Sequence, residues 1–311
     1  MSHPLISIIT PSFNRAQFIR EAIRSVMDQN YPDFEHIIID AVSTDDTLDI
    51  LRGYPHLRVV SEPDHGMYDA INKGIRMAQA EIIGLLNTDD LYAPGCFETV
   101  SDEFRRNPDA LAVVGGIATF EEKGGTREFI NHFSAIGSDE LWYRIIQGHP
   151  VTNAWFFRRR LFDQAGYFDT NFRYAADRYF LIKIALDDGV RPMPIGQELY
   201  YYRQHSGSVT MHTLDSRLPQ YGLLRTKVLM EDIIALEGFL DRPVLPAEVR
   251  QRVLREHGER CYRLAATALY HRRWRQGSNS ILRGWRRNLL WPLVFLEMAY
   301  RRLRWGVAGH G

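Results

Sequence analysis

The chain has 311 residues, of which 45% are hydrophobic and 24% charged, so it can bury a large globular core. No stretch approaches the roughly 18 to 20 apolar residues that a membrane-spanning helix needs. The N-terminus, MSHPLISIITPS, lacks the basic and apolar regions of a signal peptide. The two cysteines, Cys96 and Cys261, show no metal-ligand spacing and fit a reducing compartment. We therefore expect a cytoplasmic protein.

Strand and helix patterns alternate along the N-terminal third of the chain. Short β-branched or continuous apolar runs predict strands at residues 5–10, 34–40, 57–61, 82–86 and 110–120. Apolar residues at helical spacing predict helices at residues 15–29, 43–51, 66–79 and 97–106. This alternation is typical of an α/β fold with a mainly parallel sheet and right-handed crossovers.

The chain is organised around the stretch EIIGLLNTDD at residues 81–90. Its apolar run predicts a strand buried on both faces, and the run ends abruptly in Asn87, Thr88, Asp89 and Asp90. Adjacent carboxylates at a strand end repel each other, so a cation such as Mn²⁺ or Mg²⁺, shared with substrate phosphates, is one interpretation. Asp is also common in turns, so a strand end that caps the next turn is the other. This stretch alone leaves both interpretations open.

Two familiar nucleotide-binding folds are excluded by their missing glycines. The first strand-to-helix loop, Thr10–Arg15, contains no glycine and therefore lacks the dinucleotide-binding fingerprint. The phosphate-binding pattern G-x-x-x-x-G-K-[ST] does not occur anywhere in the chain. A nucleotide would have to be held by strand-end carboxylates and a metal.

Several blocks of the sequence stand in a recognisable order. They are PSFNR at 11–15, SVMDQNYPDFEHIIIDAVSTDDT at 25–47, SEPDHGMYDAINKGI at 61–75, IIGLLNTDD at 82–90 and GYFDTNFRYAADRYFLIKIA at 166–185. Together they resemble family 2 glycosyltransferases, which have the GT-A fold. The resemblance runs from about residue 5 to about residue 210, which makes it more specific than any single motif. It implies an inverting enzyme that uses a nucleotide-diphospho-sugar donor and a divalent cation.

The resemblance also implies roles in binding the donor. Pro11, Phe13 and Asn14 would line the base pocket, and Asp40 would accept hydrogen bonds from the base, most often uracil. Lys73, in the NKG sequence, could neutralise a phosphate, although a solvated helix lysine is the simpler interpretation.

The metal and the catalytic base are implied in the same way. Residues 87–89 stand where the family has its D-x-D motif, so Asp89 is the expected metal ligand, with Asp90 beside it. Asp177 occupies the position of the catalytic base, and His205 falls where some members place a residue near the metal or pyrophosphate. From the residues alone, Asp177 could instead cap the helix that follows it, because Asp is a preferred N-cap.

The sequence departs from the family pattern in three places. Ala41 and Val42 replace the glycines that usually follow the base-binding Asp, which makes this loop stiffer. Asn87 replaces the commoner first Asp of the metal motif, and Ala176 stands where many relatives have Glu before the catalytic Asp. The essential carboxylates, Asp89 and Asp177, are retained.

The C-terminal part of the chain has a helical pattern and a basic composition. Helical periodicity is present at residues 221–240 and 247–271. Arg272–Arg304 holds nine arginines and one glutamate, a balance of +8 that leaves −8 for the rest of the neutral chain. Tryptophans alternate with these arginines, and this composition is typical of a segment at a membrane surface. The alternative is a basic helix pair that packs on the acidic body, whereas nothing resembles a nucleic-acid recognition module.

The sequence thus predicts a GT-A glycosyltransferase domain at 1–219, with a nucleotide-sugar half at about 1–120 and an acceptor half at about 121–219, and a helical, basic region at 220–311. The expected activity is transfer of one sugar to a glycan or lipid-linked acceptor in surface polysaccharide synthesis, and the resemblance implies UDP as the nucleotide of the donor. No Q-x-x-R-W follows Asp177, so single addition is favoured over processive synthesis. The expected location is the inner face of the cell membrane, bound peripherally to anionic lipid through residues 272–305.

Two other functions agree with parts of the same pattern. A sugar-phosphate nucleotidyltransferase shares a similar fold, but it normally shows a glycine-rich, basic loop after the first strand, and TPSFNR is neither. A non-catalytic sugar-nucleotide-binding protein could keep the fold, but it would not need both Asp89 and Asp177.

Overall fold

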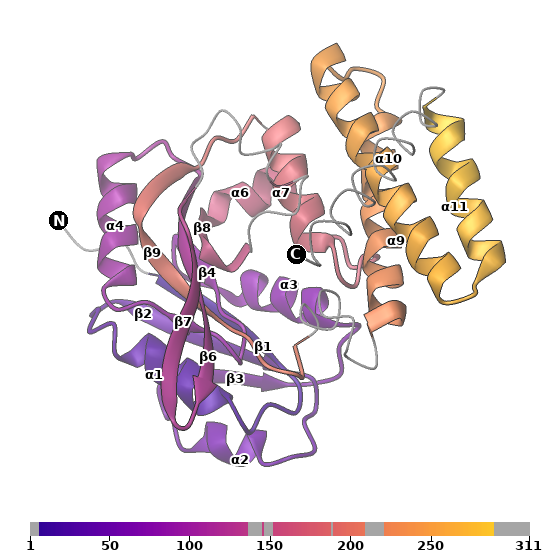
Figure 1. Ribbon diagram of the computed structural model, residues 1–311. Coiled ribbons are helices and arrows are strands. Elements are labelled where there is room, and N and C mark those ends of the chain that lie inside the picture. The colour runs from indigo at the N-terminus through magenta and orange to yellow at the C-terminus, as the bar shows by residue number, and fades with distance from the viewer. Residues whose placement is uncertain (1–5, 136–144, 146–151, 188, 209–220, 289–311) are drawn as a thin grey trace. The chain divides into compact units, whose positions relative to one another are not determined.

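The computed structural model describes residues 6–135, 145, 152–187, 189–208 and 221–288 (Figure 1). These residues fall into two compact units, 1–204 and 205–311. The division comes earlier than the predicted boundary at residue 219, which lies outside the described residues. The first unit is α/β and the second is helical, as the sequence predicts.

In the described part of the first unit, nine strands form one mixed sheet. Its strands are β1 (Ile6–Ser12), β2 (Phe34–Asp40), β3 (Leu57–Ser61), β4 (Ile82–Leu85), β5 (Leu91–Tyr92), β6 (Ala112–Lys123), β7 (Thr126–Phe133), β8 (Trp155–Arg158) and β9 (Met193–Arg203). Their order in space is β3-β2-β1-β4-β8-β6-β9-β5, and β7 pairs with β6. The first four strands in this order are parallel, whereas β8 is antiparallel to both of its neighbours.

Helices cover both faces of the parallel strands. The helices of this unit are α1 (Ile19–Met27), α2 (Thr47–Arg52), α3 (Met67–Met77), α4 (Cys96–Arg106), α6 (Arg159–Ala165) and α7 (Ala176–Leu186), with a 3₁₀ turn, η1, at Thr152–Ala154. On one face, α1 and α2 pack around Ile38 of β2. On the other face, Gly74 of α3 lies so close to Ile9 of β1 that a Cβ at Gly74 would stand 2.4 Å from the isoleucine Cγ2. Burial on both faces explains why these strands are continuous apolar runs in the sequence.

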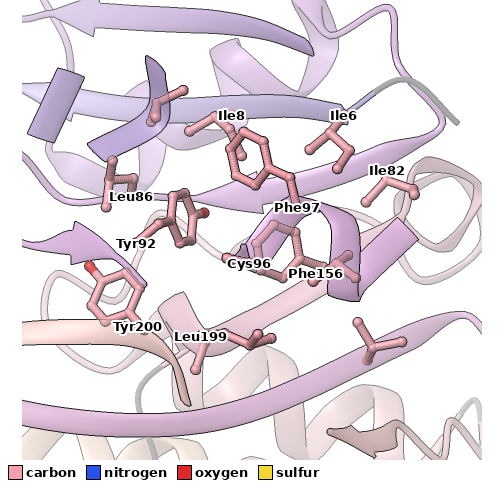
Figure 2. Close-up of a cluster of buried hydrophobic side chains, with 14 of the residues drawn as sticks. Ile6, Ile8, Ile82, Leu86, Tyr92, Cys96, Phe97, Phe156, Leu199 and Tyr200 are labelled. Atoms are coloured by element: carbon pink, nitrogen blue, oxygen red, sulfur yellow. The ribbon is translucent and has the colours of Figure 1, made fainter. Parts of the chain in front are cut away.

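A large apolar cluster fixes the strands that lead to the polar edge of the sheet (Figure 2). It joins Ile8 of β1, Phe97 of α4, Tyr92 of β5 and Tyr200 of β9. The Tyr92 ring meets Phe97 edge-on, with 5.5 Å between centroids, and meets Tyr200 edge-on at 5.8 Å. The Tyr200 ring is therefore fixed by packing, and its hydroxyl donates a hydrogen bond to Asp90 in the turn after β4.

The predicted elements are confirmed for the most part. Strands 34–40 and 57–61 have the predicted bounds, and β1 continues through Pro11 to Ser12. The helix predicted at 43–51 begins only at Thr47. The physical reason is that side chains in the preceding turn bind other backbone groups, since Asp45 accepts hydrogen bonds from the N–H of Ala16, at 3.1 Å, and of Thr47, at 3.0 Å.

The second unit contains three described helices, α9 (Tyr221–Leu240), α10 (Ala247–Tyr270) and α11 (Trp274–Arg287). Ile233 of α9 packs against Cys261 and Leu264 of α10, and α11 approaches α10 through Gly277, where a Cβ would stand 2.9 Å from Leu269. The predicted helices at 221–240 and 247–271 are confirmed. Within the described residues, no helix is both long enough and apolar enough to cross a membrane.

Candidate active site

The carboxyl ends of β2, β1 and β4 lie side by side. Ser12, at the end of β1, pairs with Asp40, at the end of β2, and Ile9 of β1 pairs with Leu85 of β4. Because these strands are parallel, the loops that follow them emerge at one edge of the sheet. Ligands of open α/β sheets bind at this edge. The topology therefore brings together residues 11–14, Asp40 and residues 87–90, as the sequence predicts.

Asp40 holds three segments of this edge together. Its buried carboxylate accepts hydrogen bonds from the Ser43 N–H at 2.8 Å, from the Ser43 hydroxyl at 2.5 Å and from the Ser61 hydroxyl at 2.9 Å. An ionised carboxylate offers about four acceptor positions. Three are used inside the protein, and the Asp40 side chain is fully buried, so the use of the fourth by a base N–H stays a prediction.

Asn14 joins the loop after β1 to the loop after β2. Its backbone N–H donates to the Ser43 hydroxyl at 2.8 Å, and its side-chain carbonyl accepts from the Thr44 N–H at 2.8 Å. Phe13 and Val42, on these two loops, are 56% and 46% exposed. The joined loops thus present apolar side chains beside the acceptor position of Asp40.

The two carboxylates after β4 have different surroundings. Asp90 is buried, and its carboxylate accepts hydrogen bonds from the Tyr200 hydroxyl at 2.7 Å, the Arg203 N–H at 2.8 Å and the Asn87 amide at 3.1 Å. Burial and the charge of neighbouring Asp89 raise the pKa of Asp90 to about 8. Asp89 is half-buried, and its backbone carbonyl accepts from the Arg203 guanidinium at 2.8 Å. Asp90 therefore anchors the turn, and Asp89 is the more accessible carboxylate.

Asp177 is the second residue of α7, and the N-cap of that helix is Ala175. The helix-cap interpretation of Asp177 is therefore wrong. The Asp177 carboxylate accepts from the Arg178 N–H at 2.7 Å. Burial, with the negative charge of Asp177 adding to it, raises the pKa of Tyr68, the second residue of α3, so Asp177 lies near the start of this helix. Helix α3 follows β3 at the same edge of the sheet as Asp40.

A family profile matches the part of the chain that carries this edge. Residues 7–166, more than half of the chain, match the profile described as glycosyl transferase family 2. The chain belongs to glycosyl transferase family 2. The match includes the loop after β1, Asp40 and the turn at Asp89, and Asp177 follows it.

Curated relatives of this family are similar over part of their length. The uncharacterized glycosyltransferase EpsJ of Bacillus subtilis is 27% identical over 221 residues, which cover 67% of this chain and 63% of EpsJ. The putative teichuronic acid biosynthesis glycosyltransferase TuaG of B. subtilis is 40% identical over 94 residues, which cover 29% of this chain and 37% of TuaG. The chain thus spans less than two thirds of the length of these relatives.

Solved structures show the same fold. S. aureus TarS in complex with UDP-GlcNAc is 17% identical, with a TM-score of 0.57 over 96% of this chain and 92% of that one. The mannosyltransferase PcManGT from Pyrobaculum calidifontis, in complex with GDP-Man and Mn²⁺, is 18% identical, with a TM-score of 0.55 over 93% and 88%. At this level of identity the likeness confirms the predicted GT-A fold.

The remaining predicted site residues of this family 2 chain have other partners. The Lys73 ammonium lies 2.9 Å from both the Glu62 carboxylate and the Pro63 carbonyl, and 3.5 Å from Asp69. It fixes the loop before α3, and its contact with a phosphate stays a prediction. His205 is the first residue of the second unit, and its Nδ1 accepts from the Gly207 N–H at 3.2 Å. Its role near a metal also stays a prediction.

Some residues that shape the site were not predicted from the sequence. Neither Tyr200 nor Arg203 has a role predicted from the sequence, yet Tyr200 donates to the Asp90 carboxylate and Arg203 donates to both Asp90 and the Asp89 carbonyl. Tyr200 and Asp90 are 110 residues apart in the chain. No local spacing pattern announces a contact over such a separation.

Proposed function

We propose that this chain transfers a sugar from a nucleotide-diphosphate donor, with UDP as the expected nucleotide, to a hydroxyl of a glycan or lipid-linked acceptor. Family membership supports the reaction class. The observation that carries the proposal is the shared sheet edge, where Asp40, at the end of β2, and the turn with Asp89, after β4, follow strands that both pair in parallel with β1. In this proposal the edge holds the base and the diphosphate, and Asp177 removes the proton.

The donor end is suited to a planar base. The exposed Phe13 ring and Val42 can pack against a base face, and the last acceptor position of Asp40 can take its N–H. Uracil N3–H is such a donor group. The hydrogen bonds between Asn14 and the 43–44 backbone hold this surface before the donor arrives, which lowers the entropy cost of binding.

A divalent cation fits the other end only together with the donor. Among the described residues, no three His, Cys, Asp or Glu side chains group into a metal cage. Asp89 would hold Mn²⁺ or Mg²⁺ jointly with the diphosphate oxygens, as Mg²⁺ is commonly bound, while Asp90 stays engaged with Tyr200 and Arg203. A bound cation supplies charge neutralisation to the leaving diphosphate. The cation bound by PcManGT in its complex supports this assignment.

Asp177 supplies the base for a direct displacement. As the acceptor oxygen bonds to the anomeric carbon, the bond from that carbon to the diphosphate oxygen breaks, and the hydroxyl proton passes to Asp177. Such a displacement inverts the anomeric carbon and needs no protein nucleophile. The buried Cys261 would be a poor one, because burial raises its pKa to about 12.

The test combines a donor screen with substitution of Asp177. The protein is incubated with UDP-GlcNAc, UDP-glucose, UDP-galactose or GDP-mannose and Mn²⁺, and release of the nucleotide diphosphate to water is measured. Asp177→Asn should lower kcat by at least about 10²-fold while leaving donor Kd unchanged, because the amide cannot take the proton. Asp163→Asn, an exposed carboxylate of α6, is the matched control and should be silent.

Two results would contradict the proposal. Wild-type turnover by the Asp177→Asn protein would remove Asp177 from the mechanism. Full turnover in excess EDTA would show that the reaction needs no divalent cation. Asp89→Asn should abolish release and also weaken the effect of Mn²⁺ on donor binding, measured by calorimetry.

The biological setting follows from the named relatives. TuaG is named for teichuronic acid biosynthesis, which supports a role for this chain in surface polysaccharide assembly. The missing Q-x-x-R-W signature favours addition of one sugar. Location at the inner face of the cell membrane would place the chain beside a lipid-linked acceptor.

We also propose that α11 contacts an anionic membrane surface. Trp274 and Trp285 are 66% and 52% exposed, Leu282 is exposed, and at 100° per residue all three share one side of the helix. The buried residues Gly277, Ser280 and Gly284 lie on another side, against α10. Exposed Arg275 and Arg286 flank the tryptophan side. Aromatic rings bordered by cations match the chemistry of an anionic lipid interface.

A further inference from the structure

Arg203, the last residue of β9, holds the turn that carries Asp89 at two points. Its Nε donates to the Asp89 backbone carbonyl at 2.8 Å, and its backbone N–H donates to the Asp90 carboxylate at 2.8 Å. Resting on the proposed function of Asp89 as the cation ligand, we propose that Arg203 is a positioning residue that fixes the place of the Asp89 carboxylate. Arg203 would touch neither the donor nor the cation and would act through the backbone of this turn.

The Arg203 side chain is itself fixed by packing. It is only 3% exposed, and its guanidinium carbon lies 5.2 Å from the centre of the Phe18 ring and 4.8 Å from the centre of the Phe120 ring. Both distances are within the range of a cation–π interaction. Phe18 is the N-cap of α1 and Phe120 lies in β6, so the two rings come from different elements. The guanidinium cannot leave the turn without losing both rings.

Two carboxylates balance the buried charge of Arg203. Its Nη2 donates to Glu21 of α1 at 3.0 Å, and its Nη1 lies 2.5 Å from the Glu122 carboxylate of β6. Burial would raise the pKa of Glu21, but hydrogen bonds from Arg203 and Arg127 lower it, so Glu21 is ionised at neutral pH. A buried charge is tolerated only where it is paired and hydrogen-bonded. The contact with Asp89 is made at its backbone carbonyl, which determines where the side chain begins.

The rest of the turn has other supports, so the Arg203 side chain makes a separate contribution. The Tyr200 hydroxyl donates to the Asp90 carboxylate at 2.7 Å, and Leu91 of β5 pairs with Tyr201 of β9. These contacts, like the backbone N–H of residue 203, persist whatever side chain stands at 203. The contact with the Asp89 carbonyl does not. Small divalent cations tolerate little displacement of their ligands, so loss of this contact should appear in cation binding.

The test changes the guanidinium and keeps its charge. Arg203→Lys retains a cation beside Glu21 and Glu122 but lacks the planar group that reaches both carboxylates and the turn together. In the presence of UDP, or of the nucleotide diphosphate of the best donor in the panel above, the Kd of Mn²⁺ should rise about 10- to 100-fold, whereas the Kd of the nucleotide in EDTA should stay within about twofold. Both constants are measured by calorimetry on the full chain.

Arg158→Lys is the matched control. Arg158 is also buried, its guanidinium carbon lies 4.7 Å from the centre of the Phe104 ring, and it pairs with Glu81. It stands opposite Ile82, at the start of β4, whereas Asp89 follows the end of that strand. Arg158→Lys should therefore lower the melting temperature without changing the Kd of Mn²⁺.

A double substitution separates positioning from a general loss of stability. In an Asp89→Asn background, Arg203→Lys should weaken nucleotide binding in Mn²⁺ no further. Should Arg203→Lys fail to fold, Glu21→Gln removes a carboxylate that holds the guanidinium and should raise the Kd of Mn²⁺ in the same direction.

Three results would each overturn the inference. They are an unchanged Kd of Mn²⁺ in Arg203→Lys, or in Glu21→Gln where it stands in, an equal further loss in the Asp89→Asn background, and the same rise in Arg158→Lys. Unchanged Mn²⁺ binding in Asp89→Asn alone would instead contradict the proposed role of Asp89.

Discussion

Val42 has a backbone conformation that β-branched residues avoid. Its φ is 57°, in the left-handed region, and its side chain is exposed. The conformation is imposed by neighbours on both sides, since Ala41 donates its N–H to the Ser12 carbonyl at 2.8 Å and Ser43 binds Asp40. The family usually has glycine in this loop, and glycine adopts such a φ without strain. Strain of this kind clusters at binding sites.

Relief of this strain should stabilise the protein. The left-handed conformation costs an L-residue about 1–2 kcal/mol, which glycine would avoid. Glycine also lowers the stability by about 0.5–1 kcal/mol, because it increases the entropy of the unfolded chain. We expect Val42→Gly to raise the free energy of unfolding by about 0.5–1 kcal/mol, as measured by urea denaturation. Val59→Gly, at a half-exposed position of β3, should lower it. A loss of stability in Val42→Gly would show that the loop is not strained.

The helices and strands show where sequence patterns succeed and where they fail. Continuous apolar runs identified β1 to β4, because burial on both faces demands them. The antiparallel β8 was not predicted, since its position between β4 and β6 is set by pairing with distant strands. The predicted start of α2 is too early, because the Asp45 carboxylate accepts hydrogen bonds from the N–H groups of Ala16 and Thr47 and the helix begins only after it.

The same reason limits prediction of the site. Asp40, Asp89 and Asp177 stand in local motifs, so the sequence could point to them through family resemblance. Tyr68 and Asn72 both contact Phe168, about a hundred positions later, and only the packing of α3 against this residue reveals them. Residues that hold a segment in place through distant contacts are therefore harder to predict than residues in a local motif.

Strand β2 carries a histidine that should make the first unit sensitive to acid. His36 is fully buried, its Nε2 lies 2.9 Å from the Thr10 hydroxyl, and burial, with a smaller effect from His56, lowers its pKa to about 3. A lowered histidine pKa means that the unfolded state binds a proton first as the pH falls below about 6.5. The resulting stability is complete above that pH and is lost as the pH falls from 6.5 towards 3.

This pH dependence can be measured by urea denaturation between pH 7 and pH 5, where few carboxylates titrate. We expect His36→Gln to remove the loss of stability on acidification that His36 contributes, seen as a difference from the wild type that grows towards pH 5, because glutamine takes up no proton. His65→Gln, which changes an exposed loop histidine, should leave the pH dependence as steep as in the wild type. An unchanged slope in His36→Gln would show that His36 is protonated in the folded protein.

On the scale of the whole molecule, charge is unevenly distributed but partly neutralised within the second unit. Arg283 donates to Glu237 of α9 at 2.7 Å, and Arg287 donates to Asp241, the residue after α9, at 3.0 Å, so these carboxylates offset two of the arginines of α11. Burial would raise the pKa of Glu237, but the hydrogen bonds from Arg283 and His257 lower it to about 2. The pairing agrees in part with the alternative in which the basic segment packs on the rest of the chain. It leaves the exposed tryptophan side of α11 to a different partner.

Substitution tests the membrane proposal better than truncation. Removing α11 would uncover the α10 surface beside Gly277 and leave Glu237 without Arg283, so a truncated protein could fail for structural reasons. Trp274→Ala combined with Trp285→Ala changes only exposed side chains. Burial of a large apolar side chain is worth about 1.5–3 kcal/mol, so the pair should weaken binding to phosphatidylglycerol-containing vesicles more than tenfold in a sedimentation assay.

The matched control and the salt dependence decide what drives this binding. Val244→Ser removes an exposed apolar side chain from the α9–α10 connection and should leave vesicle binding unchanged. Arg275→Gln with Arg286→Gln should weaken binding at low salt and have little effect at high salt, because each arginine near an anionic surface contributes about 1 kcal/mol that salt screens. If the Trp274→Ala, Trp285→Ala protein binds vesicles as tightly as the wild type, α11 does not contact the membrane. Equal binding to neutral and anionic vesicles would show that the arginines contribute nothing to the binding. In that case the tryptophans alone would attach α11 to the membrane.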